Sequence, residues 1–592
     1  MVTKSSNPII IMLKNEWQYL GKNKPRHIFY MCLLVISGLL QLVSPWIVGN
    51  IFNSIQGGQV TTEPELYHLF FLMSLLFLVE LSFRIVHWIA RVLQRLTAFQ
   101  THRNYANDKI RKATELSIKW HKDNHSGNTI DRINKARSAV FTFSNHDSFR
   151  LVYIIINIFG SLGLIFFLNV KIGIFALVSS SIILFLATSL DKTIKKSYKN
   201  INKFEHQLSA SIFDYFSNII TVVTLRLKKV VRRKLDEKIA ISYNDHKRDT
   251  YLSIAKWQLG NLAIVLMTVI ALIYQAYTDF HTAGIILIGT LFMLYSYLDR
   301  VGRYFFSFAE FYGAMTKKAA DIESAEPIDI AFEKIEDKLK TTLKKDWKQI
   351  QIKNLSFTYN QEGNIQHLNN VDFNFKRGQK IALIGESGSG KSTILTLLRG
   401  LYLPQKATIL CDNKILKHGI QTLKQSVTLI PQDPEIFNET IRYNITMDMF
   451  SKQQDLDKAI DMAQFRQVIN KLPNGVDTSV QEKGVSLSGG EKQRLALARG
   501  VLAAKSSDII LLDEPTSSVD SINEKKIHEN IFKEFEDKTI ISSIHRLHLL
   551  NKFDYIYMFD KGKIVGQGTF QEVKSNPKFK NIWKRYISGM KE

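Results

Sequence analysis

Residues 385–393 read GESGSGKST, and the segments LSGGEKQR (487–494) and IILLDEPTSSVD (509–520) follow later in the same half of the chain. The first segment matches the pattern GxxxxGK[ST], in which Lys391 and Ser392 occupy the last two fixed positions. Glycines in such a loop let main-chain N–H groups close around nucleotide phosphates, and the helix that follows adds its positive N-terminal end. Three ordered segments of this kind do not arise by chance. The sequence therefore predicts that this chain binds ATP.

Together, the three segments resemble the nucleotide-binding domain of ATP-binding-cassette (ABC) proteins. LSGGE distinguishes this family from other phosphate-loop ATPases, most of which carry only the first and third segments. The common family form is LSGGQ, so Glu491 departs from it, while Ser488, Gly489 and Gly490 are retained. The resemblance covers roughly residues 348–580. The upstream half resembles the membrane domain of a half-size exporter of the type IV (exporter-fold) class.

Length and composition favour two domains. At 592 residues, the chain exceeds what a single hydrophobic core usually holds. It has a net charge of +24 and 45% hydrophobic residues, and long apolar runs alternate with basic stretches in its first half. Its two cysteines, Cys32 and Cys411, are far apart, so neither a disulfide framework nor a zinc cluster is predicted. This pattern is typical of a chain that faces a reducing cytosol.

Six apolar stretches in the first half are each near the ~20 residues that a membrane-spanning helix needs. They run from Phe29 to Ile51, Leu66 to Ile89, Arg150 to Leu168, Ile172 to Leu190, Gly260 to Tyr277 and Ala283 to Tyr297. We therefore expect an all-α six-helix transmembrane domain at residues 1–326 and a linker at 327–347. An α/β phosphate-loop ATPase domain with a helical subdomain is expected at residues 348–592.

Basic residues set the orientation of these spans. They are concentrated before the first span, between the second and third, and between the fourth and fifth, whereas the short opposite loops contain only Lys171. The positive-inside rule then places both termini and both long connections in the cytoplasm. No signal or transit peptide is predicted, and residues 8–20 are expected to form an amphipathic helix on the cytoplasmic face. Because topology accounts for the positive charge, no nucleic-acid partner is expected.

The two long cytoplasmic connections resemble the helical extensions of exporter-fold ABC transporters. In that family each pair of extensions ends in a short coupling helix that rests on a nucleotide-binding domain. The first connection contains WHKDNHSGNTIDRI (120–133), and the second contains SASIFDYFSNIITVVTLRL (209–227). The resemblance makes Ser126, Gly127 and Asp214 to Phe216 candidates for coupling contacts. An ordinary solvated helical hairpin is the alternative.

Three polar residues interrupt the second span. Glu80, Arg84 and His87 follow helical spacings of four and three, so they share one face. Charged groups in a bilayer usually face a bundle interior or an aqueous cavity and pair with each other. Two interpretations remain open: a structural Glu80–Arg84 pair that braces helices, or a polar track that lines a transport pathway.

The resemblance also assigns the nucleotide contacts. They are Tyr359, Gly385, Glu386, Ser387, Gly388, Ser389, Gly390, Lys391, Ser392, Thr393, Gln432, Ser488, Gly489 and Gly490. Tyr359 matches the family's aromatic residue that stacks on adenine, although an aromatic at strand spacing also fits a hydrophobic core. Lys391 is expected to pair with the β- and γ-phosphates.

Magnesium and catalysis are assigned to residues that follow apolar strands. The run Ile509 to Leu512 ends in Asp513 and Glu514, and two acids at this place suit magnesium-dependent phosphoryl transfer. The predicted magnesium contacts are Ser392, Gln432 and Asp513, and the predicted catalytic residues are Glu514, His545, Gln432 and Lys391. Glu514 is expected to polarise the attacking water. His545, in SSIHRL, matches the family's switch histidine at the γ-phosphate.

The motifs also predict a partner. In the family, LSGGE closes over ATP held by the opposite subunit, so Ser488 and Gly490 would complete a neighbour's site. One copy of each motif implies a dimer with a second half-transporter, and filled catalytic positions favour a homodimer. Two segments depart from the family's common forms: VQEKG (480–484) stands in place of VGERG, and SSVD (517–520) in place of SALD. These departures are expected to affect the coupling of hydrolysis to transport more than hydrolysis itself.

The sequence thus predicts a half-size ABC exporter, an ATP hydrolase that moves a lipid, hydrophobic or amphiphilic compound and contacts membrane lipids. Its richness in lysine, isoleucine and asparagine favours the bacterial inner membrane. An exporter-fold importer for a metal chelate or similar small molecule would share every motif. A regulatory ABC protein is a further alternative, but it would be expected to carry a degenerate site or an added domain. The motifs identify neither the substrate nor the direction of transport.

Overall fold

The computed structural model describes residues 7–56, 62–124, 126–334, 342–359, 366–433, 435–449, 452–480, 487–544, 546–577 and 579–580. His545 and residues 481–484 of the VQEKG segment lie outside the described residues. Contacts divide the chain into two compact units. The helical unit comprises Met1–Thr114 and Gly127–Asp329, and the sheet unit comprises Glu115–Ser126 and Ile330–Glu592.

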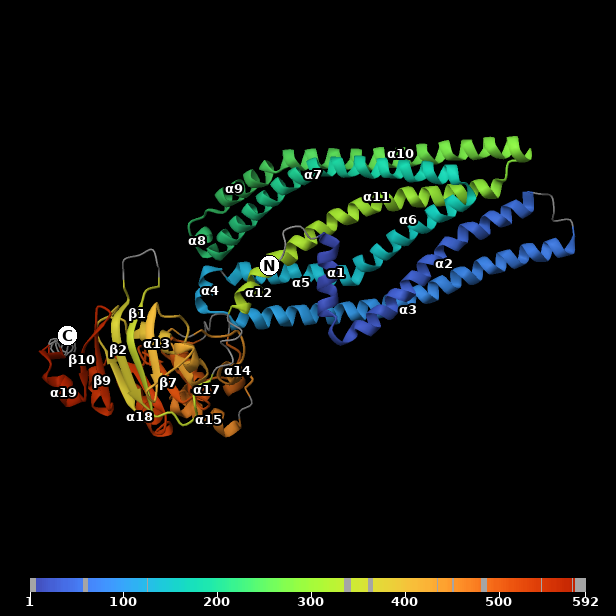
Figure 1. The fold of residues 1–592 in the computed structure, drawn as a ribbon. Helices are drawn as coiled ribbons and strands as arrows, with labels where there is room; N and C mark the ends of the chain where they lie inside the picture. Colours follow the sequence, from blue (N-terminus) through green and yellow to red (C-terminus); the bar gives the residue numbers. More distant parts are fainter. Residues whose placement is uncertain are drawn as a thin grey trace. The chain divides into compact units, whose positions relative to one another are not determined.

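The helical unit opens with α1 (Pro8–Tyr19), as predicted for residues 8–20. Asn7 caps this helix by accepting a hydrogen bond from the Ile9 amide, and Pro8 begins it where a missing N–H costs nothing. The long helices are α2 (Lys24–Gln56), α3 (Glu63–Glu115), α5 (Ser126–Thr142), α6 (Ser148–Leu168), α7 (Val170–Ser217), α10 (Tyr243–Ala283) and α11 (Ile288–Ser324) (Figure 1). Shorter ones are α8 (Ile219–Thr224), α9 (Lys228–Ile241) and α12 (Glu326–Glu333), and a π-helical turn (Phe143–Asp147) joins α5 to α6.

Five of the six predicted spans lie within single helices, namely α2, α3, α6, α7 and α10. The predicted start of the sixth span, Ala283, is wrong, because α10 continues to that residue and α11 begins at Ile288. The physical cause is Gly284, which ends α10 at φ 69°, a left-handed conformation that glycine adopts without steric cost.

Length and composition qualify four described helical segments to cross a membrane: Gly21–Gln56, Glu63–Glu115, Gly127–Leu168 and Lys228–Thr282. Val170–Leu186 is a shorter apolar helical segment. In α11 the apolar stretch is interrupted early by Asp299 and Arg300. Arg300 is not left unsatisfied, since its Nη1 donates to the Gln41 carbonyl of α2 at 3.0 Å.

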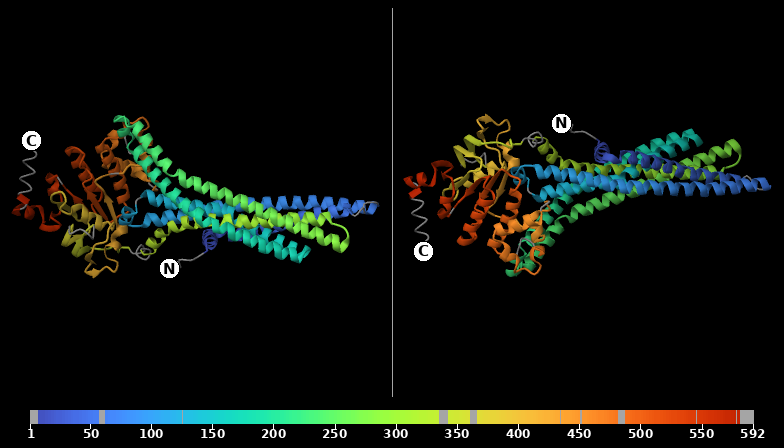
Figure 2. Two further views of the ribbon diagram at one scale, coloured as in Figure 1. Left: turned by 90° about the horizontal axis from the view of Figure 1, so that it is seen from above. Right: turned by 90° about the horizontal axis from the view of Figure 1, so that it is seen from below.

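Small residues let the helices of this unit approach closely. A Cβ on Gly289 of α11 would collide with the Gly49 carbonyl of α2, so the two backbones are in contact there. The Gly289 amide donates to Asn53 Oδ1 at 2.8 Å, and the Tyr297 hydroxyl donates to the Leu42 carbonyl at 2.8 Å. Helices α7 and α10 lie side by side along most of their length, as both views of Figure 2 show. Close packing and buried hydrogen bonds therefore hold the bundle together.

The sheet unit contains two sheets. One is antiparallel with the order β2-β1-β4-β5, built from β1 (Gln349–Phe357), β2 (Leu368–Lys376), β4 (Lys406–Cys411) and β5 (Lys414–Ile415). The other has the order β10-β9-β3-β8-β7-β6, built from β3 (Lys380–Ile384), β6 (Val427–Ile430), β7 (Ile509–Asp513), β8 (Thr539–Ser543), β9 (Tyr555–Asp560) and β10 (Lys563–Gly568). Only the β10–β9 pair of this second sheet is antiparallel. Strands β3 and β7 are buried at every residue, as is typical of central parallel strands.

Helices surround these sheets. They are α4 (Ile118–Asp123), α13 (Lys391–Leu398), α14 (Ile441–Thr446), α15 (Gln453–Met462), α16 (Arg466–Ile469), α17 (Gly489–Ala504), α18 (Ser521–Glu534) and α19 (Phe570–Ser575). Helices α14 to α17 form the helical subdomain predicted at about residues 435–500. Because parallel strands end at the same sheet edge, the loops after β3, β6, β7 and β8 meet there, and they carry the predicted site residues.

Candidate nucleotide-binding site

The loop between β3 and α13 has the shape of a phosphate cradle. Gly385, Gly388 and Gly390 have φ values of 149°, 77° and 110°, which residues with a side chain rarely adopt. A Cβ on Gly385 would also collide with the Phe559 carbonyl, so only glycine fits. Among the residues that the structure describes, the buried hydroxyl of Ser389 has no hydrogen-bond partner. A loop of main-chain amides that leads into a helix N-terminus suits the phosphates of ATP.

Lys391, the first residue of α13, is buried, and its Nζ donates to the carbonyls of Gly385 (2.8 Å) and Glu386 (3.1 Å). Burial lowers the pKa of the Lys391 ammonium group, and the nearby carboxylates of Glu514 and Asp513 oppose this shift. The lysine is thus a desolvated cation at the mouth of the cradle. It is placed where an anionic phosphate would compensate its charge.

The next residue connects the cradle to β7. The Ser392 hydroxyl donates to Asp513 Oδ1 at 2.9 Å. Burial, followed by the neighbouring charge of Glu514, raises the pKa of the Asp513 carboxyl group. A hydroxyl and a carboxylate side by side are the oxygen ligands that magnesium prefers, so these residues fit the predicted metal.

Glu514 follows β7 in a left-handed conformation with φ 47°. Its Oε2 accepts from Gln432 Nε2 at 3.2 Å, and its Oε1 accepts from the Ser543 hydroxyl at 3.3 Å. The structure therefore brings together the predicted pair Gln432 and Glu514. The sequence analysis did not identify Ser543, whose only sequence signal is its place two residues before His545 at the end of an apolar strand.

The LSGGE segment forms the start of α17. The Ser488 hydroxyl accepts from the Glu491 amide at 3.4 Å, while Glu491 Oε2 accepts from the Ser488 amide at 2.8 Å. This reciprocal capping box is compatible with the departure from LSGGQ, because a glutamate side chain can cap the helix just as a glutamine can. The negative charge of the glutamate also interacts favourably with the positive N-terminal end of the helix. The hydrogen bond from the Ser488 amide holds the pKa of Glu491 below its usual range. Ser488 and Gly489 are exposed.

Gln493 of α17 connects two loops of the site, the one after β6 and the one after β7. Its Nε2 donates to the Ser517 hydroxyl (2.8 Å) and the Gln432 carbonyl (3.3 Å), and its Oε1 accepts from the Ser518 amide (2.8 Å). A Cβ on Gly490 would lie 2.7 Å from the Ser518 carbonyl, so α17 closely approaches the same turn. Gln493 is buried and lies within LSGGEKQR, but its role was not predicted from the sequence.

Arg546 holds the segment that follows Ser517 and Ser518. Its guanidinium donates to the Ser521 hydroxyl, Glu524 Oε2 and the Val519 carbonyl, each at 3.0 Å. Glu524 is buried, and its Oε1 accepts from the Thr516 hydroxyl at 2.9 Å. The segment after Glu514 is therefore held from both sides.

Tyr359 packs in an aromatic cluster at the end of β1. Its ring lies 4.8 Å from those of Phe357 and His367 and 5.0 Å from that of Tyr402, all at steep angles. Tyr402 also contacts the predicted coupling segment, because Lys122 of α4 places its Nζ 5.7 Å from the centre of the Tyr402 ring. A cavity of about 360 Å³ is lined by Ser117 and Lys119, which directly precede this segment, together with Tyr359 and Tyr402.

The predicted coupling residues lie on two helices. Ser126 and Gly127 begin α5. Asp214 to Phe216 lie at the end of α7, where Asp214 and Phe216 are exposed. The contact described for the first segment is made by Lys122, which the sequence analysis did not identify.

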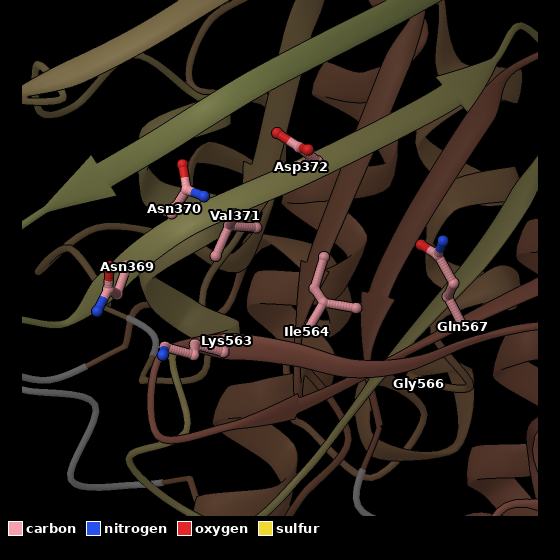
Figure 3. Close-up of a pocket in the computed structure, with 8 residues that line it drawn as sticks. All are labelled: Asn369, Asn370, Val371, Asp372, Lys563, Ile564, Gly566 and Gln567. Carbon is pink, nitrogen blue, oxygen red and sulfur yellow. The ribbon is translucent and has the colours of Figure 1, made fainter.

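A separate polar groove of about 550 Å³ lies where the edge strands β2 and β10 meet. Figure 3 shows the side chains along it, including Asn369, Asp372, Lys563 and Gln567. None of the predicted nucleotide contacts lines this groove. The groove is therefore separate from the predicted nucleotide contacts.

In the helical unit, the predicted Glu80–Arg84 pair is confirmed, with 2.8 Å between Glu80 Oε1 and Arg84 Nη2. His87 turns to α6, where its Nδ1 lies 2.9 Å from the Tyr153 hydroxyl. Tyr153 in turn is 2.8 Å from the Ser37 hydroxyl of α2. His87 thus joins α3 to α6, whereas the Glu80–Arg84 pair lies within α3, so these contacts do not decide between the two interpretations of that pair.

Family models of known proteins match both the helical unit and the sheet unit. The family model described as ABC transporter matches residues 368–517, and the model described as ABC transporter transmembrane region matches residues 27–301. A provisionally named export ATP-binding/permease protein of Rickettsia typhi is 25% identical over 94% of this chain and 96% of its own length. An ATP-dependent lipid A-core flippase of Photobacterium profundum is 37% identical over 38% of each chain. The fold is similar to the solved structure of a bacterial Atm1-family ABC exporter with ATP bound, with a TM-score of 0.79, 22% identity and coverage of 95% of this chain and 99% of that one.

Proposed function

This chain belongs to the ABC transporter family as a multi-pass membrane protein with its transmembrane region fused to an ATPase domain, and we propose that it exports a lipid, hydrophobic or amphiphilic compound. Both termini and the ATPase domain are proposed to lie in the cytoplasm. The distribution of basic residues supports this orientation. We further propose the bacterial inner membrane as its location.

The geometry of the cradle supports hydrolysis by in-line attack of water on the γ-phosphate. Lys391 would neutralise the β- and γ-phosphates, and Glu514, oriented by Gln432 and Ser543, would accept the hydrogen bond of the attacking water. Ser392 and Asp513 would hold magnesium, which supplies charge neutralisation at the phosphates. Tyr359 is proposed to stack on adenine, and His545 to contact the γ-phosphate.

One observation carries the coupling of hydrolysis to transport. The segment Glu115–Ser126, at the end of the long helix α3, belongs to the sheet unit. Through Lys122 it contacts Tyr402, whose ring contacts Tyr359. A movement of the adenine-binding side chain therefore has a direct route to a helix that continues into the membrane.

A second copy of the chain is the proposed partner. The region around α8 exposes large apolar side chains: Phe213 is 72%, Phe216 67% and Ile220 80% exposed. Such a patch favours burial against another protein surface. Ser488 and Gly489 are likewise exposed at the start of α17, where they are available to a neighbour's nucleotide. A homodimer satisfies both features.

The proposed substrate class is supported by the polar Glu80–Arg84 pair within an apolar span, which suits a compound with both polar and apolar parts. The similarity to a lipid A-core flippase over 38% of this chain points to the same class. Glu80 and Arg84 are proposed to lie along the transport pathway.

Magnesium-dependent hydrolysis in lipid nanodiscs tests this proposal, with wild type compared with Glu514→Gln across lipids, amphiphilic drugs, peptides and metal chelates. Stimulation of wild type by lipids or amphiphiles, with a silent variant, is the expected result. Stimulation by metal chelates alone would replace the proposed substrate class. An absence of hydrolysis would contradict the homodimer and direct the search to a different half-transporter.

A further inference from the structure

Helix α2 contains a proline within its apolar stretch. Pro45 lies inside both the helix and the predicted span from Phe29 to Ile51, and it divides α2 into a first segment, residues 24–44, and a second segment, residues 46–56. Because proline has no N–H, the carbonyl four residues earlier, that of Gln41, lacks its usual helical donor. An unsatisfied carbonyl is costly in apolar surroundings, so a neighbouring helix must supply the missing donor.

Helix α11 supplies that donor. Arg300 Nη1 donates to the Gln41 carbonyl at 3.0 Å. One turn earlier in α11, the Tyr297 hydroxyl donates to the Leu42 carbonyl at 2.8 Å and is in hydrogen-bonding contact with the Trp46 amide. A carbonyl and the amide four residues later are the two ends of one helical hydrogen bond, so α11 serves two consecutive positions of the α2 ladder at the proline.

The two segments of α2 form hydrogen bonds with different helices. In the first segment, the Ser37 hydroxyl lies 2.8 Å from the Tyr153 hydroxyl of α6. In the second segment, Asn53 Oδ1 accepts from the Gly289 amide of α11 at 2.8 Å. The gap in the backbone ladder therefore coincides with a change of hydrogen-bonding partner, and each segment is anchored by its own neighbour.

Arg300 is the charged member of the contact at the proline. Of three charged residues on this stretch of α11, Asp299 and Arg303 pair with each other, whereas Arg300 reaches across to α2. Gln41 lies within the first apolar stretch, so the charge is held at membrane depth, where ionisable residues are costly and usually functional. Arg300 therefore completes the α2 backbone at a depth where no water is at hand to do so.

We propose that Pro45 is a joint of α2 that α11 holds closed. In the described conformation Arg300 and Tyr297 satisfy the two positions of the ladder, and release of these bonds lets the second segment turn relative to the first during transport. A helix bends most easily where its ladder is interrupted, and discrete bonds to a neighbouring helix give the joint two distinct states. The joint depends neither on the class of the substrate nor on the direction of transport.

Thermal unfolding of the full chain in lipid nanodiscs tests whether Arg300 serves the proline. Arg300→Met leaves the Gln41 carbonyl without a donor, and we expect the unfolding midpoint to fall by about 3 °C. Pro45→Ala restores the missing N–H, so the same arginine substitution should lower the midpoint much less in that background. Arg303→Met is the matched control, because it also removes a charge from α11, and its effect should be the same in both backgrounds.

Distances between two spin labels test whether the joint moves. The labels are placed at Ile55 of α2 and Phe167 of α6, both exposed, in a chain whose two cysteines are replaced by serine and which is diluted with unlabelled protein. A turn of about 20° over roughly 14 Å of helix displaces its end by about 5 Å, so ATP with vanadate should shift the distance by at least about 3 Å. Pro45→Ala should abolish the shift while hydrolysis without substrate continues, and Arg300→Met should show part of it without ATP.

An equal effect of Arg300→Met in the two backgrounds would show that the arginine does not serve the proline and would overturn the proposal. So would a shift of unchanged size in Pro45→Ala, or the absence of any shift in wild type that hydrolyses ATP. Hydrolysis measured on the same preparations reports separately on the proposed function, and the unfolding measurements require no ATP.

Discussion

The Ser392 hydroxyl donates a 2.9 Å hydrogen bond to Asp513 Oδ1, which joins two residues 121 positions apart in the sequence. It links the start of α13, behind the phosphate cradle, to the last residue of the buried strand β7. Two oxygen ligands for a hard cation are thereby placed beside the loop that would hold the phosphates.

Replacement of Ser392 by alanine removes one of these ligands. We expect magnesium-dependent hydrolysis to fall by about a hundred-fold or more, because charge on the phosphates is no longer neutralised. Binding of a fluorescent ATP analogue in the presence of a chelator should change little. Ser392→Thr keeps the hydroxyl and is the matched control. If the alanine variant kept its dependence on magnesium, the assignment of Ser392 would be wrong.

Glu491 should be needed as a helix cap and not for its charge. Glu491→Ala loses the bond from the Ser488 amide, and we expect a destabilisation of about 1 kcal/mol, seen as a lower midpoint of thermal unfolding. Glu491→Gln restores the family's LSGGQ and keeps an acceptor oxygen, so its midpoint should stay close to that of wild type. A glutamine variant as unstable as the alanine variant would contradict the capping role.

Gln493 is expected to position the segment after Glu514. Gln493→Ala removes the bonds to Ser517 and Ser518, and we expect kcat for ATP hydrolysis to fall at least about ten-fold while KM for ATP stays nearly constant. The matched control is Gln453→Ala, an exposed glutamine of α15 that bonds to Asp457. A change in KM alone would show that Gln493 acts on nucleotide binding instead.

The contact between Lys122 and Tyr402 should order the coupling segment. We expect Tyr402→Ala to raise amide hydrogen exchange in residues 115–126 by about five-fold, because the cation loses its ring. Tyr402→Phe keeps the ring but loses the hydroxyl that also interacts with Lys122, so its exchange should lie between those of wild type and the alanine variant, whereas Lys414→Ala at a distant exposed lysine should exchange as wild type does. Unchanged exchange in the alanine variant would mean that this contact does not hold the segment.

His528 should make the folded chain sensitive to acid. Burial lowers the pKa of His528 from 6.5 to about 4, so the unfolded chain binds this proton more readily than the folded one. The stabilisation is fully present above pH 6.5 and is lost as the pH falls towards 4, with a loss of about 2 kcal/mol by pH 5. Thermal unfolding between pH 5 and 7.5 should therefore show a smaller pH dependence for His528→Gln than for wild type. Identical pH profiles would show that His528 is not buried in its neutral form.

Residues whose roles follow from a contiguous segment could be predicted from the sequence. The cradle from Gly385 to Thr393 is local, because its glycines, lysine and serine act through consecutive backbone positions. The long apolar helices are local as well, since membrane spanning depends on length and composition. The start of the sixth span was misplaced because Gly284 ends α10 through its backbone conformation, which hydrophobicity does not report.

The sequence by itself determined the chemical groups of this protein: a phosphate loop, two acids after an apolar strand, and apolar helices with basic ends. Only the tertiary structure decided which groups meet. Hydrogen bonds act over about 3 Å, and the order of the strands in the sheets determines which distant segments come that close. Ser543 reaches Glu514 since β8 lies beside β7, and Gln493 reaches Ser517 since α17 packs against that turn.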